Sequence, residues 1–364
     1  MVGDYKKTPL FEMHQRMGAR MIQFGGWDMP LEYSGIVKEH QAVRNAAGLF
    51  DISHMGEFEV SGPEALGLIQ FVTSNDAARL ADGQAQYSAL PTPDGTVVDD
   101  LLVYRFSQDR YMLVVNAANT QRDFEWIASH NRFNARIADV TDKTALLSLQ
   151  GPLAAGILGP LVDAALPALD PFHFTHAKIL GFDAVLSRTG YTGEDGFEIY
   201  LPSEHSEAVW TGLLDAGRPS GLLPAGLGAR NTLRLEAKML LYGNDMDLTT
   251  TLLEAGLGWI VKLDKGEFLG RAALQKQKAE GVKRILAGFE MLGRDIARDG
   301  YPVRIGGREV GCVTSGAPSI TLKKNIGLTY LPVEHAVIGS KFEVSIRGRD
   351  CGAQVVPTPF YKRR

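Results

Sequence analysis

Two adjacent aspartates, Asp99 and Asp100, stand inside an otherwise apolar run, TVVDDLLVY (residues 96–104). The run follows a Pro-Asp-Gly turn sequence, so it is predicted to form the second strand of a hairpin. Side chains alternate between the faces of a strand, and each carboxylate therefore lies among apolar neighbours on its own face. Because an unpaired carboxylate in such surroundings is costly or takes up a proton, at least one of them is expected to have a dedicated partner, in the protein or in a ligand.

A glycine-rich stretch, RTGYTGEDGFEIY (residues 188–200), is the second candidate site. Its three glycines at three-residue spacing permit positive φ values and close approach of the backbone to a ligand, although composition alone favours a long hairpin loop. In the strand that follows, Glu198 points away from its apolar neighbours Phe197 and Ile199. The spacing is not the dinucleotide-binding pattern, because the stretch does not lead from a strand directly into a phosphate-binding helix.

The third candidate is GLGARNTLRLEA (residues 226–237), a glycine-rich turn that enters a predicted helix. Arg230 and Arg234 lie four positions apart and therefore share a face of this helix. An arginine near a helix N-terminus suits an anionic group. The alternative, an ion pair with Glu236 or with another surface acid, is the one that the residues alone favour.

The histidines and cysteines indicate neither a metal site nor a cysteine nucleophile. None of the eight histidines forms an H-x-x-x-H pair, and His173 and His176 are predicted to lie on opposite faces of a strand. The two cysteines, Cys312 and Cys351, are too far apart for a metal motif or a disulfide framework, and they fit a reducing compartment. No G-x-S-x-G motif is present.

The composition is that of an ordinary globular protein, with 45% of the 364 residues hydrophobic and 22% charged. The formal net charge is -4, and basic residues cluster only in the C-terminal KRR, which disfavours nucleic-acid binding. No apolar run has the length of a transmembrane helix, and the N-terminus lacks a signal-peptide core. The sequence therefore predicts a cytoplasmic protein of two or three domains that does not bind a membrane.

An internal repeat organises the larger, N-terminal part of the chain. The segments EVSGPEALGLI and SLQGPLAAGIL match at Gly62-Pro63 and Gly151-Pro152, and in each the proline is predicted to open a helix after a strand. Each is followed by three strand-like segments and one helix-like segment, so the shared pattern is β-α-β-β-β-α. From about residue 283, short strands with glycine turns predict a small β-barrel or sandwich.

The predicted fold class is α+β, with two repeated antiparallel α+β subdomains followed by a C-terminal β-barrel domain. The predicted boundaries place residues 1–282 in the first domain and residues 283–364 in the barrel. One subdomain is expected to cover residues 55–140, and the other to combine residues 1–54 with residues 141–250. The polar segment GRAALQKQKAEG is the expected helical link.

Short segments spread over nearly the whole chain carry a family resemblance. In order, they are KTPLFEMH, FGGWDMPLEY, LFDISHMGEFEVSGPEA, VVDDLLVY, VVNAAN, LQGP, RTGYTGEDGFEIY, AGLGARNTLRLEA, LLYGNDMD and PFY. They resemble the aminomethyltransferases, the T-proteins of the glycine cleavage system. The resemblance implies a three-lobed α+β arrangement with tetrahydrofolate in a central cavity, in agreement with the two subdomains and the terminal barrel.

The resemblance implies an enzyme, a tetrahydrofolate-dependent one-carbon transferase. In the family's reaction, the aminomethyl group on the lipoyl arm of the H-protein meets tetrahydrofolate, ammonia leaves, and 5,10-methylenetetrahydrofolate and the dihydrolipoyl arm are released. The implied partners are the lipoylated H-protein and, functionally, the glycine decarboxylase and dihydrolipoyl dehydrogenase components. Tetrahydrofolate is a co-substrate, and no metal, flavin or NAD is implied. A monomer is expected, since the enzyme must dock a carrier protein.

The resemblance also assigns roles to residues. The family's key carboxylate falls on Asp100, where it would orient the reacting nitrogens of the folate and stabilise iminium-like charge. Glu198 matches the folate-binding glutamate, which accepts two parallel hydrogen bonds from the aminopyrimidine edge of the pterin, and Arg230 matches a folate-contacting arginine. The other residues that the resemblance assigns to the folate pocket are Tyr87, Asn116, Tyr191 and Tyr361.

Two neighbouring positions bear on these roles. Asn231 stands where the family commonly has Asp after the arginine, which puts the anchoring of Arg230 in question. Asp99 is expected to face away from Asp100, toward protein or solvent. In the structural alternative, Asp100 caps a turn or pairs with an arginine.

Two related classes of protein are the alternatives. Folate-binding assembly factors for iron–sulfur proteins share the fold, but they carry a Cys-containing glycine motif near LLYGNDMD, where this chain has no cysteine. Demethylating modules of sarcosine and dimethylglycine dehydrogenases are fused to a flavin domain, for which a 364-residue chain without a dinucleotide fingerprint has no room. Both differences favour the aminomethyltransferase.

Overall fold

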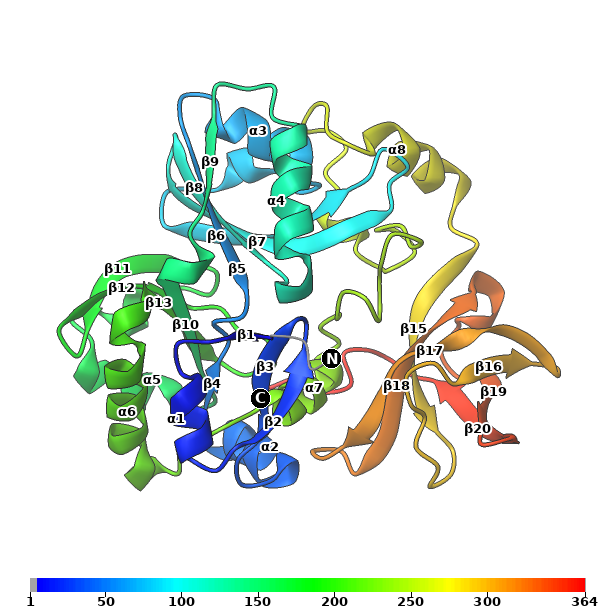
Figure 1. The fold of residues 1–364 in the computed structure, drawn as a ribbon. Coiled ribbons are helices and arrows are strands. Elements are labelled where there is room, and N and C mark those ends of the chain that lie inside the picture. The colour runs from blue at the N-terminus through cyan, green and yellow to red at the C-terminus, as the bar shows by residue number, and fades with distance from the viewer. Residues whose placement is uncertain (1–4, 364) are drawn as a thin grey trace. The chain divides into compact units, whose positions relative to one another are not determined.

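The computed structural model describes residues 5–363 and has a mixed α+β fold (Figure 1). The chain divides into two units. The first holds the chain up to Ile69 together with Ala77–Ser88 and Leu101–Asn231. The second holds Gln70–Asp76, Ala89–Asp100 and the chain from Thr232 onward. Within the described residues, no helix is both long and apolar enough to span a membrane.

The predicted repeat is present as two copies of one series of elements. The elements of the first copy are β5 (Gly56–Ser61), α3 (Ala65–Val72), β6 (Gln84–Pro91), β7 (Val97–Ser107), β8 (Arg110–Val115) and α4 (Thr120–Ser129), followed by β9 (Arg136–Asp139). The elements of the second copy are β10 (Thr144–Gln150), α5 (Ala154–Leu158), β11 (Phe174–Ile179), β12 (Phe182–Ser187), β13 (Gly196–Pro202) and α6 (Ser206–Gly217). Strand β4 (Gly48–Asp51) precedes both copies, and β14 (Leu223–Pro224) and α7 (Leu227–Glu236) follow them.

The two copies form sheets with the same strand order. The first sheet is β6-β7-β8-β5-β9, and the second is β11-β12-β13-β10-β4, with β14 added in parallel beside β4. In each, the first strand of the repeat lies between the last strand of the repeat and a strand from outside it. The β-α-β-β-β-α repeat that the sequence predicts is therefore confirmed, and so is the hairpin of β6 and β7 that contains the two aspartates.

The backbone requires glycine in each Gly-Pro pair. Gly62 has a φ of +122° and Gly151 one of +134°. A Cβ atom at these positions would lie 2.8 Å from the Asn134 carbonyl oxygen and 2.5 Å from the Ala46 carbonyl oxygen. The expectation that proline opens each helix is wrong, because both prolines lie in the turn, two residues before α3 and α5 begin. The fixed φ of proline stabilises this turn instead.

The N-terminal elements before β4 include a small sheet of their own. They are β1 (Lys6–Lys7), α1 (Phe11–Arg16), β2 (Arg20–Phe24), β3 (Trp27–Glu32) and α2 (Ile36–Asn45), and the small sheet has the order β1-β3-β2. A hydrogen-bonded series of side chains connects α1 to β4. The hydroxyl oxygen of the half-buried Tyr33 lies 2.9 Å from Nδ1 of His14, and Nε2 of His14 lies 2.8 Å from the carboxylate of Asp51. His14 and Asp51 are buried polar groups and need such partners, so these hydrogen bonds hold α1 on the sheet.

The second large sheet has one apolar face and one polar face. Helices α5 and α6 cover one face of this sheet (Figure 1). The apolar core on that side includes Leu147, Leu149, Phe197, Ile199 and the fully buried Trp210 of α6. The alternate residues of the same strands point to the opposite face. The polar or aromatic side chains on that face include Phe50, Ser148, Ser187, Glu198 and Tyr200. The candidate site is built on this polar face.

The second unit contains the predicted C-terminal barrel. Helix α8 (Arg271–Glu280) precedes β15 (Arg284–Met291), β16 (Pro302–Ile305), β17 (Arg308–Ser319), β18 (Lys324–Pro332), β19 (Lys341–Ile346) and β20 (Arg349–Val355). The six strands close in the order β15-β18-β17-β16-β19-β20 around an apolar core that includes Phe289, Val303 and Phe342. Closure leaves no free sheet edge, and it confirms the barrel rather than the sandwich.

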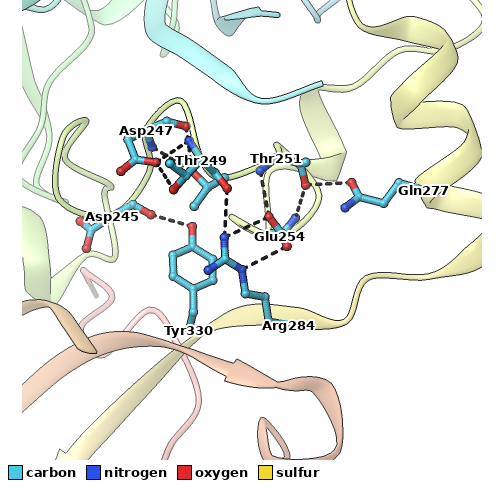
Figure 2. Close-up of polar contacts among 9 residues, drawn as sticks. Asp245, Asp247, Thr249, Thr251, Glu254, Gln277, Arg284 and Tyr330 are labelled. Carbon is cyan, nitrogen blue, oxygen red and sulfur yellow. Dashed lines mark hydrogen bonds and ion pairs between the residues drawn. The ribbon is translucent and has the colours of Figure 1, made fainter. Parts of the chain in front are cut away.

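Polar contacts hold the irregular segment before α8 against the barrel (Figure 2). The Tyr330 hydroxyl donates to the Asp245 carbonyl oxygen at 2.7 Å. Arg284 donates to the Glu254 carboxylate at 3.1 Å and to the Thr249 carbonyl oxygen at 3.1 Å. Two of these hydrogen bonds go to backbone carbonyl oxygens of the irregular segment, which has no helix or strand to provide their partners.

Candidate functional site

Glu198 lies at the centre of the polar face of the second large sheet. Its neighbours across the adjacent strands are Ser148 on β10 and Ser187 on β12. The side chain points away from Phe197 and Ile199, which are in the apolar core, as the alternation of the strand predicts. Glu198 is only 6% exposed, so its carboxylate is largely removed from water.

One oxygen of the Glu198 carboxylate has a partner and the other is open. The Thr189 hydroxyl donates to Oε2 at 2.6 Å. Within residues 5–363, no group donates a hydrogen bond to Oε1. Burial raises the pKa of the Glu198 carboxyl, whereas the hydrogen bond from Thr189 and the positive charge of Arg230 act in the opposite direction. This carboxylate can therefore accept further hydrogen bonds from a ligand.

Four hydroxyl side chains, which we call the hydroxyl cluster, lie beside Glu198: Ser187, Thr189, Tyr104 and Tyr200. The Tyr104 oxygen lies 2.9 Å from the Tyr200 oxygen and 3.3 Å from that of Thr189, which lies 3.0 Å from the Ser187 oxygen. All four residues are buried, and burial raises the pKa of both tyrosines. None of the four was predicted from the sequence, although Tyr104 shares strand β7 with Asp100 and Thr189 lies in the glycine-rich stretch.

The glycine-rich stretch is shaped by Gln150 at the end of β10. A Cβ atom on Gly190 would lie 2.1 Å from the Gln150 side chain, and one on Gly196 would lie 2.6 Å from it. Gln150 donates to the Thr189 carbonyl oxygen and accepts a hydrogen bond from Thr192. The three glycines do not share a positive φ, because among them only Gly193, at +81°, has one. At the other two positions the backbone approaches a protein side chain closely.

A buried ion pair fixes the far side of the same loop. The Arg44 guanidinium donates to the Glu194 carboxylate and to the Thr192 carbonyl oxygen, both at 2.8 Å. Both side chains are 6% exposed. Breaking a pair of this kind leaves a buried charge without compensation, so the pair stabilises this conformation of the loop. Thr189 lies in this loop, which the Arg44–Glu194 pair and the Gln150 side chain hold in place.

The structure brings three of the predicted residues together in the first unit. The Arg230 guanidinium lies over the Tyr191 ring, 4.5 Å from its centroid, and its charge acts on Glu198. Asn231 is exposed, and stacking on the Tyr191 ring contributes to the position of Arg230. His54 was not predicted from the sequence; it is 2% exposed, and its Nδ1 has no hydrogen-bond partner in the described part of the chain. Burial and then the charge of Arg230 lower the pKa of His54 to about 3, so this imidazole is neutral.

Arg234 has a structural role. Its guanidinium donates to the Asp245 carboxylate at 2.7 Å and to the Ser315 hydroxyl at 2.8 Å. For Arg234, the expected alternative of an ion pair is therefore confirmed in kind, but the partner is the buried Asp245 and not Glu236 or a surface acid. Glu236 is itself buried and accepts hydrogen bonds from Ser319 and Thr321. The four-residue spacing places both arginines on one face of α7, but their partners come from distant segments.

The two aspartates of β7 differ in burial. Asp99 is 0% exposed, so it faces protein rather than solvent, and Asp100 is half-buried. Asp100 belongs to the second unit, as does Tyr361, whose N–H donates to the Glu236 carbonyl oxygen at 2.8 Å. The other predicted residues, both half-buried and both in the first unit, are Tyr87 on β6 and Asn116, directly after β8.

No three His, Cys, Asp or Glu side chains of residues 5–363 are grouped so that they could hold a metal ion. The described site offers an open carboxylate, a stacked guanidinium, and hydroxyl and imidazole groups. Such groups bind a flat, polar ligand through hydrogen bonds and stacking.

Similarity to known proteins extends over both units. Two family models match, the GCVT N-terminal domain over residues 10–265 and the glycine cleavage T-protein C-terminal barrel domain over residues 284–362. The chain is 54% identical to the aminomethyltransferase of Symbiobacterium thermophilum over 98% of this chain and 97% of that protein. It is 49% identical to the aminomethyltransferase of Desulfitobacterium hafniense strain Y51 over 99% of each. The crystal structure of glycine cleavage system aminomethyltransferase T from Bartonella henselae matches with a TM-score of 0.93 and 35% identity, over 99% of each chain.

Proposed function

Because this chain belongs to the aminomethyltransferase family of the glycine cleavage system, we propose which of its residues carry the family's reaction. The chain is an enzyme of this kind, a tetrahydrofolate-dependent transferase. Glu198, Arg230 and Tyr191 bind tetrahydrofolate, and Asp100 acts at the reacting atoms. The one-carbon unit comes from the aminomethyl group on the lipoyl arm of the H-protein.

The observation that carries this proposal is the open Glu198 carboxylate. The aminopyrimidine edge of a pterin presents two neighbouring N–H donors, which match the two oxygens of a carboxylate. Glu198 Oε1 is open, and Oε2 uses one of its acceptor sites for Thr189. The same carboxylate is buried, so hydrogen bonds to it are strengthened by the exclusion of water.

Arg230 and Tyr191 supply a cation and a flat ring beside this carboxylate. The guanidinium keeps its charge at any physiological pH and opposes the effect of burial on Glu198. Stacking on the Tyr191 ring limits its orientations. In our proposal, Arg230 donates hydrogen bonds to oxygen atoms of the folate, and the Tyr191 ring packs against it.

Asp100 is the proposed catalytic residue. On its face of β7 it lies between Val98 and Leu102, and Val98 is fully buried. A carboxylate in apolar surroundings interacts strongly with positive charge that develops as ammonia leaves and the methylene carbon becomes iminium-like. It also orients the folate nitrogens that form the new bonds.

The remaining assignments complete the proposal. Tyr87, Asn116 and Tyr361 contact the folate or the acid that acts on it. Tetrahydrofolate is a co-substrate, the lipoylated H-protein is the direct partner, and the glycine decarboxylase and dihydrolipoyl dehydrogenase components are functional partners. We also propose a cytoplasmic location, which the unpaired cysteines Cys312 and Cys351 support.

The proposed domain division places the boundary at residue 283. The two family models, which end at residue 265 and begin at residue 284, support this division. The first domain, residues 1–282, combines both repeats with the helical link, and residues 283–364 form the barrel domain.

The test is a measurement of ammonia release from aminomethylated, lipoylated H-protein, with and without tetrahydrofolate. Formation of methylenetetrahydrofolate is followed in the same sample. Rapid release that depends on folate supports the proposal. Folate binding without any release would contradict it and would favour a folate-binding assembly factor.

A further inference from the structure

The hydroxyl cluster connects two buried tyrosines to the carboxylate proposed to bind folate. Its members come from β7 (Tyr104), β12 (Ser187), the loop before β13 (Thr189) and β13 itself (Tyr200). Their oxygens form a continuous series, from Tyr200 to Tyr104 at 2.9 Å, to Thr189 at 3.3 Å and on to Glu198 Oε2 at 2.6 Å. The sheet forms through backbone hydrogen bonds and does not need these hydroxyl groups. The presence of four buried hydroxyls beside one carboxylate therefore calls for an explanation.

Each hydroxyl has one proton to donate, and this limits the pattern of hydrogen bonds. Thr189 lies within reach of both Ser187 and Glu198, but it can donate to one of them at a time. The bond to a carboxylate is charge-assisted and shorter, so the proton goes to Glu198. Thr189 then accepts from Tyr104, and Tyr104 accepts from Tyr200. All the donors of the series point toward Glu198, and each bond polarises the next.

We propose that Thr189, supported by Tyr104 and Tyr200, is a positioning residue that fixes Glu198 as a hydrogen-bond acceptor with Oε1 open to the ligand. This inference rests on the proposed function of Glu198 in folate binding. A carboxylate held in this way selects a ligand edge with two adjacent N–H donors. A protonated Glu198 would instead present a donor of its own and would oppose such an edge.

The charged and titratable groups around Glu198 show why Thr189 is needed. Burial raises the pKa of Glu198, and Arg230 from α7 opposes this effect. Tyr104 from β7 and Tyr200 from the same strand stay neutral, since burial raises the pKa of both. Beyond these groups, Glu57 on β5 acts on Tyr200, and the neutral His54 lies near Arg230. Without Thr189, Arg230 alone would oppose the effect of burial.

The experiment measures the ionisation of Glu198 directly in ligand-free protein. Side-chain carboxyl carbons of glutamate are labelled with ¹³C, and their NMR shifts are followed with pH in the wild type, Thr189→Val and Thr189→Ser. Glu198→Gln identifies the Glu198 signal by its absence. We expect Thr189→Val to move the midpoint upward by about one pH unit, as expected when one hydrogen bond to a charged group is lost. Thr189→Ser should restore the wild-type midpoint.

The same variants are then tested for tetrahydrofolate affinity over a pH range that spans the Glu198 midpoints measured for the wild type and for Thr189→Val. Thr189→Val should begin to lose affinity at a pH about one unit higher than the wild type does, and each should lose up to tenfold per pH unit below its own midpoint. Thr192→Val is the matched control. It removes a buried hydroxyl of the same loop, but this hydroxyl donates to Gln150 and not to Glu198. It should leave the titration of Glu198 unchanged. Tyr104→Phe should move the midpoint in the same direction as Thr189→Val, but less.

The outcomes separate this inference from the proposed function. An unchanged Glu198 midpoint in Thr189→Val would overturn the positioning role. A shifted midpoint without any change in folate affinity would support the role of Thr189 and contradict folate binding by Glu198. If Thr189→Val does not fold, the Glu198 midpoint of Tyr104→Phe is compared with that of the wild type instead. An unchanged Glu198 midpoint in Tyr104→Phe would then overturn the proposal.

Discussion

The Arg234 guanidinium and the Asp245 carboxylate form a buried ion pair at 2.7 Å, with side chains that are 2% and 0% exposed. Thr314 also donates to this carboxylate at 2.6 Å, and the Leu241 N–H donates to it at 3.0 Å. The pair therefore joins the C-terminal half of α7, the irregular segment after it and strand β17 of the barrel.

Asp245→Ala should destabilise the protein strongly, because it leaves the Arg234 charge buried without its partner. The expected loss in the free energy of unfolding is about 3–5 kcal/mol, measured by urea denaturation. Asp215→Ala is the control, since the Arg218–Asp215 pair is exposed, and it should cost less than about 1 kcal/mol. Equal losses in the two variants would contradict the structural role given to the buried pair.

The partners of Arg234 could not be predicted from the sequence. The four-residue spacing of Arg230 and Arg234 predicts that they share a helix face, and it predicts nothing about the groups opposite that face. Asp245 follows Arg234 by 11 positions in a segment without regular periodicity, and Ser315 lies 81 positions away. Such partners are determined by tertiary packing, so the choice between a ligand-binding and a structural arginine required the structure.

The polar face of the second sheet could be predicted only in part. Alternation along β13 predicts the direction of Glu198, because the period of a strand is fixed. The Gly-Pro repeat likewise predicts the order of helices and strands along the chain in both copies, whereas the order of the strands within each sheet came from the structure. The hydroxyl cluster was not predictable, since Tyr104 lies 85 positions from Thr189 and 96 from Tyr200. These contacts depend on how strands from the two repeats approach each other.

Glu198→Gln should weaken tetrahydrofolate binding. An amide of the same size offers one acceptor atom in place of two and carries no charge. The loss of a hydrogen bond to a charged group corresponds to about 1.5–3 kcal/mol, or roughly a 10- to 150-fold increase in Kd. Calorimetric titration with tetrahydrofolate measures it. Glu59→Gln, on the partly exposed Glu59 that pairs with Arg110, should bind folate as the wild type does.

The adjacent aspartates of β7 offer a matched pair of variants. Asp100→Asn should lower turnover by about 100-fold or more, with the fold and the folate affinity largely retained, because it removes a charge that acts in the transition state. Asp99→Asn should instead lower the thermal midpoint, because Asp99 is fully buried in protein. Turnover and thermal unfolding are measured for both. Failure of Asp100→Asn to fold would favour a structural role for Asp100.

Gly190→Ala should disturb the loop that carries Thr189. The added methyl group would meet the Gln150 side chain at 2.1 Å, and overpacking of this kind typically costs about 1–3 kcal/mol. Folate affinity should fall together with stability, since Gln150 also holds the Thr189 carbonyl oxygen. Gly156→Ala in α5 is the control: apart from the adjacent residues and the backbone of its own helix, no atom of residues 5–363 lies within 4 Å of the added methyl group, and the helix should gain up to about 1 kcal/mol. A wild-type Kd in Gly190→Ala would show that the loop tolerates the shift.

Glu57 should make the stability of the protein depend on pH. The residue is 0% exposed, and neither carboxylate oxygen has a hydrogen-bond partner within residues 5–363. Burial, with a smaller contribution from Asp139, raises its pKa well above the ordinary value of 4.5. The folded protein therefore keeps a proton that the unfolded chain loses above pH 4.5. The stabilisation is complete below that pH and is lost as the pH rises toward the folded-state pKa.

Glu57→Gln removes this titration while keeping the size of the side chain. The free energy of unfolding of the variant, relative to the wild type, should therefore increase with pH by up to about 1.4 kcal/mol per pH unit. Urea denaturation at several pH values between about 5 and 8 measures this difference. Glu59→Gln on the same strand is the control, because Glu59 is partly exposed and paired with Arg110. A difference between Glu57→Gln and the wild type that stays constant over the whole range would mean that Glu57 is already ionised in the folded protein.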